Sequence, residues 1–164
     1  MFKKINILFL SMCSIGYSKY APGTVASFVT CLMFIYFYNL QINIITLTLS
    51  VSLIFIYAVF AIDYYKNYFK KIDAKEIVID EFVGQSIPLL TIYNFLQKNN
   101  TGNFILYTLL AFFLFRLFDI LKPYPINKID KIVKNGFGVM FDDVLAGIYS
   151  SIVILTFFSF ILYE

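Results

Sequence analysis

Residues 42–62 read INIITLTLSVSLIFIYAVFAI, a run of 21 residues without one charged side chain. A helix of about 20 apolar residues is long enough to cross the hydrocarbon core of a bilayer. Residues 144–163, VLAGIYSSIVILTFFSFILY, form a second uncharged run of 20 residues. These two stretches predict helices that span a membrane.

The composition also favours a membrane protein. Apolar residues make up 60% of the 164-residue chain and charged residues 14%, against about 45–50% and about 25% in soluble domains. A soluble domain of this size has too small an interior to bury so many apolar side chains. The length fits a single domain over residues 1–164. The net charge of +3 comes from lysines between apolar runs, which argues against a nucleic-acid-binding surface.

Three shorter apolar stretches, residues 25–40, 82–96 and 104–115, complete the pattern. They reach spanning length only as helices that continue through neighbouring polar residues such as Asp80 and Asp119. The predicted fold class is therefore all-α: a polytopic membrane helical bundle with about five membrane segments. Residues 5–13 are interpreted as an additional short N-terminal segment that lies at the interface or re-enters the membrane.

The cations are distributed unequally between alternate loops. If the first membrane segment runs outward from the cytoplasm, twelve of the 13 Lys and Arg residues lie inside, and only Lys98 lies outside. Cytoplasmic loops of membrane proteins carry such an excess of positive charge. This topology also places every polar motif of the chain on the cytoplasmic side.

Four polar motifs interrupt the apolar pattern. They are GYSKYAPGT (16–24), DAKEIVIDEFVG (73–84), FRLFDILKPYPI (115–126) and GFGVMFDDVLAG (136–147). In the first, Thr24 follows a Pro-Gly turn and is a candidate N-cap. In the second, Glu76 and Asp80 share a face if the segment is helical. In the third, Pro123 and Pro125 are expected to stop the helix.

Paired acids open two of the predicted apolar helices, at residues 80–81 and 142–143. A glycine follows four residues after Asp80 and again after Asp143, which would leave room beside each carboxylate. Attraction to a helix N-terminus is worth only about 0.3–1 kcal/mol. An acid at the bilayer centre costs about 2.5–3.5 kcal/mol, and less near the interface. A bound divalent cation, or else protonation, would account for both pairs.

Acids next to cations indicate phosphate chemistry. Mg²⁺ takes oxygen ligands, commonly carboxylates together with substrate phosphate and water. Acids that hold Mg²⁺, with Arg116 and Lys122 on the phosphate oxygens, would make a phosphoryl-transfer site. The chain has no histidine, which excludes Ser-His-Asp catalysis and a histidine phosphoenzyme. Water and an aspartate remain as candidate nucleophiles.

At these motifs the sequence resembles the bacterial phosphatidylglycerophosphatase A family. The matching blocks are GYSKYAPGTVAS (16–27), IVIDEFVG (77–84), FRLFDILKPYPI (115–126) and GFGVMFDDVLAG (136–147), in the family's order and spacing. The resemblance implies Mg²⁺-dependent hydrolysis of phosphatidylglycerophosphate to phosphatidylglycerol and inorganic phosphate. It also implies a multi-pass protein of the bacterial cytoplasmic (inner) membrane, with the active site facing the cytoplasm. The oligomeric state is left open.

The resemblance and the chemistry together assign expected roles to individual residues. The expected Mg²⁺ ligands are Asp80, Glu81, Asp142 and Asp143. Asp119 is expected either to bind the metal or to position the attacking water, so the expected catalytic residues are Asp80, Asp119 and Asp143. The expected substrate-binding residues are Arg116 and Lys122, which would hold the phosphate, with Lys19, Thr24 and Ser27.

A transporter or ion-pathway protein that uses intramembrane carboxylates is the alternative. The acids, however, cluster at one predicted membrane face and do not form a chain across the bilayer. The outer half of each apolar segment is nearly uncharged. The pattern therefore favours the phosphatase.

Overall fold

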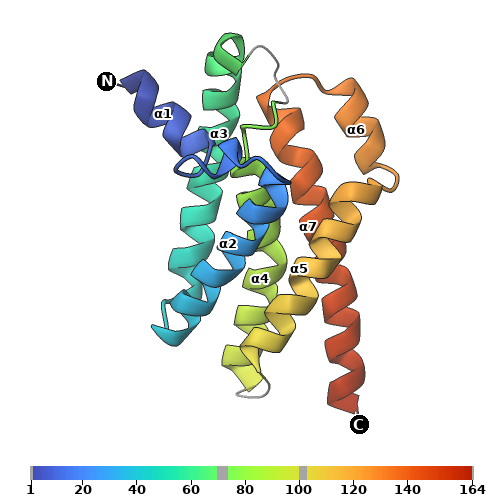
Figure 1. The fold of residues 1–164 in the computed structure, drawn as a ribbon. Coiled ribbons are helices and arrows are strands. Elements are labelled where there is room, and N and C mark those ends of the chain that lie inside the picture. Colours follow the sequence, from blue (N-terminus) through green and yellow to red (C-terminus); the bar gives the residue numbers. More distant parts are fainter. Residues whose placement is uncertain (1, 70–73, 100–102, 164) are drawn as a thin grey trace.

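Helix α4, Ile79–Asn99, packs against α2, α3, α5 and α7 and is the central helix of the bundle (Figure 1). The computed structural model describes residues 2–69, 74–99 and 103–163. The other elements are α1 (Phe2–Leu10), the 3₁₀ helix η1 (Ile15–Tyr17), α2 (Pro22–Asn39), α3 (Ile44–Phe69), α5 (Phe104–Leu121), α6 (Ile126–Ile132) and α7 (Gly136–Tyr163). No strand occurs within these ranges, and the all-α prediction is confirmed.

Among the described residues, three helices combine the length and the hydropathy needed to cross a membrane. They are Ile44–Tyr65 of α3, Phe104–Leu121, which is the whole of α5, and Gly136–Ser159 of α7. Large apolar side chains on these helices face outward, as Leu53 and Phe113 do with 67% and 68% of their surface exposed. Such exposure suits lipid better than water. Helices α2 and α4 have 18 and 21 residues but do not reach the same hydropathy. The membrane bundle is confirmed, while the number of five segments stays a prediction.

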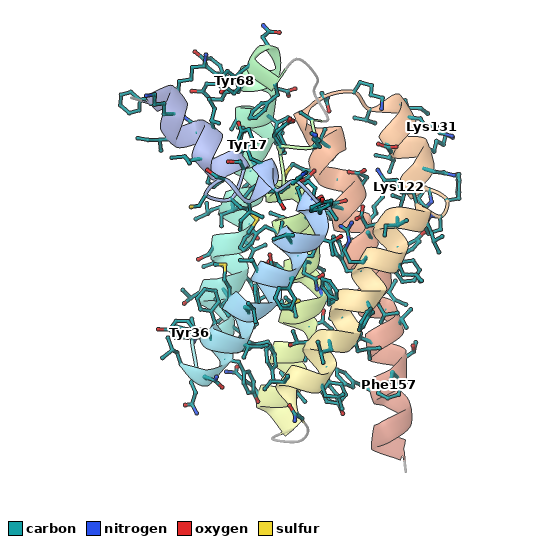
Figure 2. All side chains as sticks on the ribbon, in the orientation of Figure 1. Tyr17, Tyr36, Tyr68, Lys122, Lys131 and Phe157 are labelled. Carbon is teal, nitrogen blue, oxygen red and sulfur yellow. The ribbon has the colours of Figure 1, made fainter. Side chains whose placement is uncertain are left out.

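The directions of the helices bring the polar motifs together. Helices α2, α4 and α7 begin at the same end of the bundle, and α3 and α5 end there (Figure 1). Lys98 lies in the last turn of α4, at the opposite end. The start of α4 and the end of α5 therefore lie at the end of the molecule where Lys122 and Lys131 are found (Figure 2).

Two short apolar stretches extend into their polar neighbours, as predicted. Helix α4 begins one residue before Asp80, and α5 continues past Asp119 to Leu121. Lys122 follows in a left-handed conformation with a φ of 41°, and Pro123 comes directly after it. The helix therefore stops where the prolines predicted. The seven-residue helix α6 was not predicted, because it is too short to show a clear apolar period.

Two local predictions about helix starts are wrong, and the condition for a third, a helix that includes Glu76, is not met. Pro22 is the first residue of α2, after Ala21 with a φ of 41°, so Thr24 lies inside the helix and is not its N-cap. Proline suits a first helical position because its φ is fixed and no N–H is needed there. Glu76 precedes α4 and does not share a helix face with Asp80. Helix α7 begins at Gly136, so the acid pair 142–143 lies in its second turn and does not open it.

The start of α7 is held by α3. The Asp63 carboxylate oxygen Oδ1 accepts a hydrogen bond from the Gly136 backbone N–H at 2.8 Å. The first N–H groups of a helix have no partner within the helix, so Asp63 satisfies one of them from a neighbouring helix. This contact fixes where α7 enters the bundle.

Helices α4 and α7 cross closely at two glycines. A Cβ added to Gly84 would lie 2.7 Å from the Asp143 carbonyl oxygen, and one added to Gly147 would lie 2.3 Å from the Gly84 carbonyl oxygen. Pro88, four residues after Gly84, has no N–H to donate to that carbonyl. The glycines therefore make room for the neighbouring backbone, and not for a carboxylate as the sequence suggested. This crossing brings Asp80 and Asp143 together, because each lies four residues before its glycine.

Candidate active site

Three carboxylates meet where α4 and α7 approach each other. Asp80 and Glu81 lie in the first turn of α4, and Asp143 lies in α7. Each offers a carboxylate oxygen, and these oxygens all lie within 4.8 Å of one another. Asp80 and Asp143 are buried, with 9% and 5% of their surface exposed. Three acids this close repel one another unless a proton or a cation lies between them.

The start of α2 forms the next wall of the site. A Cβ added to Gly23 would lie 1.9 Å from Glu81 Oε1 and 3.3 Å from Arg116 Nη1. Only a glycine allows the Glu81 carboxylate and the Arg116 guanidinium to approach the α2 backbone so closely. The Pro-Gly turn therefore has a packing role that the sequence did not reveal.

The other candidate residues on this segment lie around that contact. Ser27 is buried, and its hydroxyl donates to the Gly23 carbonyl oxygen at 2.9 Å. Thr24 is half-buried in the first turn of α2. Lys19 is exposed, with Nζ 5.6 Å from the centre of the Tyr20 ring. Gly23 is thus the residue of this motif for which the structure shows contact with the acid cluster.

Arg116 and Asp119 form an ion pair at the end of α5. Arg116 Nη1 lies 2.5 Å from Asp119 Oδ2, although the approach is not aligned as a hydrogen bond. Both side chains are mostly buried, at 17% and 14% exposure. Arg116 Nε is buried without a hydrogen-bond partner. The guanidinium therefore has donors left for an anion.

Lys122 links three segments at this end of the bundle. Its Nζ donates to Asp142 Oδ2 at 2.6 Å and lies 3.3 Å from Asp130 Oδ1 of α6. Burial lowers the pKa of the ammonium group, but the hydrogen bond and the charges of Asp142 and Asp130 raise it more. The net pKa of Lys122 lies above its usual value, so the lysine stays charged at neutral pH.

The two aspartates of the 142–143 pair have different surroundings. Asp142 contacts Lys122, whereas Asp143 belongs to the three-carboxylate cluster. The sequence predicted both as metal ligands because adjacent acids look alike in a motif. Asp130 of α6, which also contacts Lys122, was missed because a single aspartate among lysines gives no signal.

The chemistry of the cluster fits Mg²⁺. Asp80, Glu81 and Asp143 supply carboxylate oxygens, the ligand type that Mg²⁺ prefers. Glu81 Oε2 is buried and has no hydrogen-bond partner, so an oxygen of the cluster is left available as a metal ligand. Asp73, the first residue of the second polar motif, lies outside the described residues.

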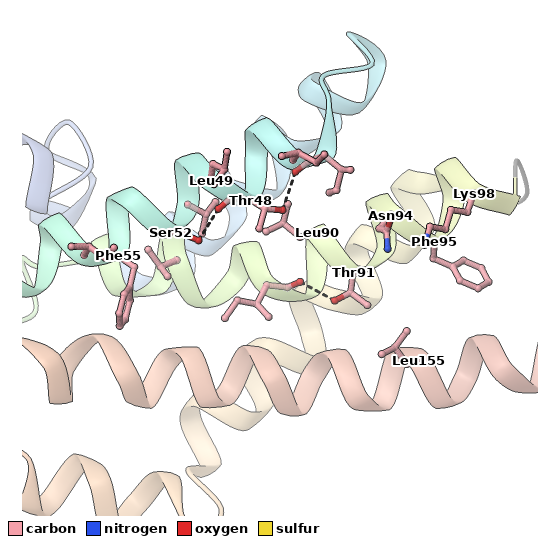
Figure 3. Close-up of a pocket in the computed structure, with 16 residues that line it drawn as sticks. Thr48, Leu49, Ser52, Phe55, Leu90, Thr91, Asn94, Phe95, Lys98 and Leu155 are labelled. Carbon is pink, nitrogen blue, oxygen red and sulfur yellow. Dashed lines mark hydrogen bonds between the residues drawn. The ribbon is translucent and has the colours of Figure 1, made fainter.

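A groove away from the acids has a different character. It lies between α3 and α4, with a volume of about 990 Å³, and Figure 3 shows Leu49, Phe55 and Leu90 among its lining side chains. Its lining includes Lys98 near the far end of α4 but none of the candidate acids. The groove is therefore separate from the candidate active site.

Comparison with known proteins decides the family. The family model described as Phosphatidylglycerophosphatase A matches residues 8–158, a range that holds every candidate site residue. The chain belongs to the phosphatidylglycerophosphatase A family. The resemblance found in the four motifs is thereby confirmed, and the chain is a phosphoric monoester hydrolase.

Three relatives show how far the similarity extends. A Bacteroides thetaiotaomicron protein, provisionally named a phosphatidylinositol-3-phosphatase, is 35% identical over 85% of this chain and 84% of its own. The phosphatidylglycerophosphatase A of Haemophilus influenzae is 49% identical over 50% of this chain and 45% of its own. That of Escherichia coli is 35% identical over 48% of this chain and 41% of its own. No solved structure matches the chain.

Proposed function

We propose that this protein is a Mg²⁺-dependent phosphatidylglycerophosphatase of the bacterial inner membrane. It would hydrolyse phosphatidylglycerophosphate to phosphatidylglycerol and inorganic phosphate. The observation that carries the proposal is the three-carboxylate cluster of Asp80, Glu81 and Asp143 beside Arg116, which still has unpaired donors. A cation site next to an anion site is what hydrolysis of a phosphate monoester needs.

The acids would hold the metal and the cations would hold the substrate. Mg²⁺ bound by Asp80, Glu81 and Asp143 would neutralise phosphate oxygens and make a water molecule more acidic. Arg116 would donate to phosphate oxygens from the side of α5. Asp119 keeps the guanidinium oriented through its ion pair and can accept a proton from the attacking water.

The first turn of α2 would complete the phosphate site. Val25 N donates to the Ala21 carbonyl oxygen at 3.1 Å and is the first N–H of this helix with a partner inside it. The N–H groups of Gly23 and Thr24 come before it, and such groups at a helix start bind anions. Because Gly23 lies against Glu81 and Arg116, a phosphate bound by these N–H groups would lie next to both side chains.

Lys122 would bind the phosphate, and its ion pair with Asp142 would hold it in position. An ammonium group has three N–H donors, and Asp142 and Asp130 occupy two directions around Nζ. The third donor is left for a phosphate oxygen. In this proposal Asp142 fixes Lys122, and the metal ligands are the three acids of the cluster.

The site is proposed to face the cytoplasm, and labelling of single cysteines can test this. In a Cys13→Ser background, Lys98→Cys should react with a membrane-impermeant thiol reagent in intact cells. Lys131→Cys should react only after permeabilisation. Both lysines are exposed, at opposite ends of the bundle. The reverse labelling pattern would show that the site faces outward.

Hydrolysis of a phosphoinositide is the second candidate function, because of the name of the Bacteroides relative. Both substrates carry a phosphate monoester on a lipid headgroup, so the site described here suits either. Their headgroups differ in size: a phosphorylated glycerol in one, a phosphorylated inositol ring in the other. A direct comparison of the two lipids is therefore needed.

The test is phosphate release by the purified protein in detergent micelles. Phosphatidylglycerophosphate, phosphatidylinositol 3-phosphate and phosphatidic acid are supplied in turn, each with Mg²⁺ and with a chelator. We expect Mg²⁺-dependent release with the first lipid preferred. Preference for the second lipid would favour phosphoinositide hydrolysis. Equal release in the presence of the chelator would contradict the requirement for Mg²⁺. No release from any lipid by folded protein would favour an ion pathway.

A further inference from the structure

Gln85 is a buried polar residue whose side chain lacks every expected partner. It lies in α4 one helical turn after Glu81 and is completely buried. Neither Oε1 nor Nε2 of its amide has a hydrogen-bond partner. Leaving a buried polar group unpaired costs about 1–3 kcal/mol. An amide in this position needs a partner that the isolated chain does not provide.

Neighbouring buried polar residues satisfy themselves locally. The Ser86 hydroxyl donates to the Phe82 carbonyl oxygen at 2.7 Å, and the Thr30 hydroxyl donates to the Ala26 carbonyl oxygen at 2.8 Å. Such hydrogen bonds to the preceding turn lower the free-energy cost of burying a short hydroxyl side chain in a membrane helix. The longer Gln85 side chain makes no bond of this kind, so a local structural role does not account for it.

Glu81 has an unpaired acceptor that matches the unpaired donor of Gln85. Its Oε2 is buried without a hydrogen-bond partner, while its Oε1 lies against the Gly23 backbone. Residues four apart lie on the same face of a helix, so Gln85 lies directly below Glu81 on α4. An amide N–H is a donor, and a carboxylate oxygen is an acceptor. The two groups therefore complement each other chemically.

We propose that Gln85 is a positioning residue for Glu81. Its Nε2–H donates to one buried water molecule, which in turn donates to Glu81 Oε2, and so holds Glu81 in the three-carboxylate cluster. The proposal rests on the Mg²⁺ site of the proposed function. Partners of this kind, which orient a metal ligand without touching the metal, typically contribute about 10-fold to 100-fold in metal affinity or activity.

Mn²⁺ binding without substrate tests this role separately from turnover. Free Mn²⁺ is measured by electron paramagnetic resonance for the parent protein, Gln85→Met, Gln85→Glu and the control Ser86→Ala, all in detergent. Methionine keeps the length of the side chain but removes the donor, and glutamate keeps the shape but replaces the donor with an acceptor. We expect both to bind Mn²⁺ at least about 10-fold more weakly, while Ser86→Ala binds like the parent.

Thermal unfolding without metal separates positioning from structural support. Gln85→Met replaces a buried polar group that has no partner within the chain by an apolar one, so its metal-free unfolding temperature should equal or exceed that of the parent. Parent-like Mn²⁺ affinity in both Gln85 variants would overturn the role of Gln85 and leave the metal site intact. A lower metal-free unfolding temperature with unchanged affinity would assign Gln85 a purely structural role. A parent protein that binds no Mn²⁺ would overturn the metal site itself, and the role of Gln85 with it.

Discussion

Replacing Asp143 by asparagine is expected to lower phosphate release from phosphatidylglycerophosphate by about three orders of magnitude, because a catalytic metal supplies several kcal/mol of transition-state stabilisation. Asparagine keeps the shape of the side chain but removes its charge. Asp143 is 5% exposed and belongs to the cluster whose oxygens lie within 4.8 Å of one another. The same change relieves repulsion between buried acids. The metal-free protein should therefore unfold at the same or a higher temperature while turnover is lost.

Asp130→Asn is the matched control for this experiment. Asp130 is 29% exposed and lies 3.3 Å from Lys122, outside the acid cluster. Partly exposed ion pairs near a surface typically contribute about 0–1 kcal/mol, so turnover should change by less than about fivefold. If Asp143→Asn kept most of the activity in folded protein, Asp143 would be removed from the metal site. An equal loss in both variants would indicate a general effect of charge at this end of the bundle.

Replacing Gly147 by alanine is expected to damage both the fold and the site. The added methyl carbon would lie 2.3 Å from the Gly84 carbonyl oxygen, and backbone atoms cannot rotate away as a flexible side chain can. Overpacking of this kind costs about 1–3 kcal/mol. Because Gly147 lies four residues after Asp143, separation of α4 from α7 also separates Asp143 from Asp80 and Glu81. We expect a lower unfolding temperature and weaker Mn²⁺ binding.

Ser50→Thr provides the comparison, since it adds one methyl group to a helix without crowding. Ser50 is exposed on α3, and its hydroxyl donates to the Thr46 carbonyl oxygen at 2.8 Å, a bond that threonine can also make. The unfolding temperature and the Mn²⁺ affinity of the Ser50→Thr protein should match those of the parent. A Gly147→Ala protein with parent-like stability and affinity would show that α4 and α7 are not held in close contact at this point.

The general architecture could be predicted from the sequence because lipid and water impose strong and different demands. The uncharged run 42–62 predicted the helix observed as α3. The length needed to span a bilayer predicted that α4 extends to Asp80 and that α5 extends past Asp119. The candidate residues could be found because acids near an apolar run are costly. The four motifs around them also resemble one family, whose model matches residues 8–158.

The details that the sequence did not reveal depend on contacts between helices, which a pattern along one helix does not contain. Asp142 and Asp143 are adjacent and identical in type, so the sequence does not distinguish them. In the structure Asp142 pairs with Lys122, whereas Asp143 belongs to the three-carboxylate cluster. Gly23, Gly84 and Gly147 matter because a neighbouring helix approaches each of them. Gln85 carried a weak signal, as a polar residue in an apolar run four residues after Glu81. A search for polar residues one turn away from the acids would have found it.

The order of helices along the chain affects how the enzyme is made. Asp80 and Glu81 arrive on α4, but Asp143 arrives on α7, which the ribosome synthesises after α5 and α6. A nascent chain that has inserted only its first helices holds two of the three carboxylates and cannot assemble the cluster. Under the proposed function, the catalytic centre would be complete only when α7 has docked against Gly84 of α4, so hydrolysis would begin only after α7 has entered the bundle. Chains truncated before α7 would then be inactive in the membrane.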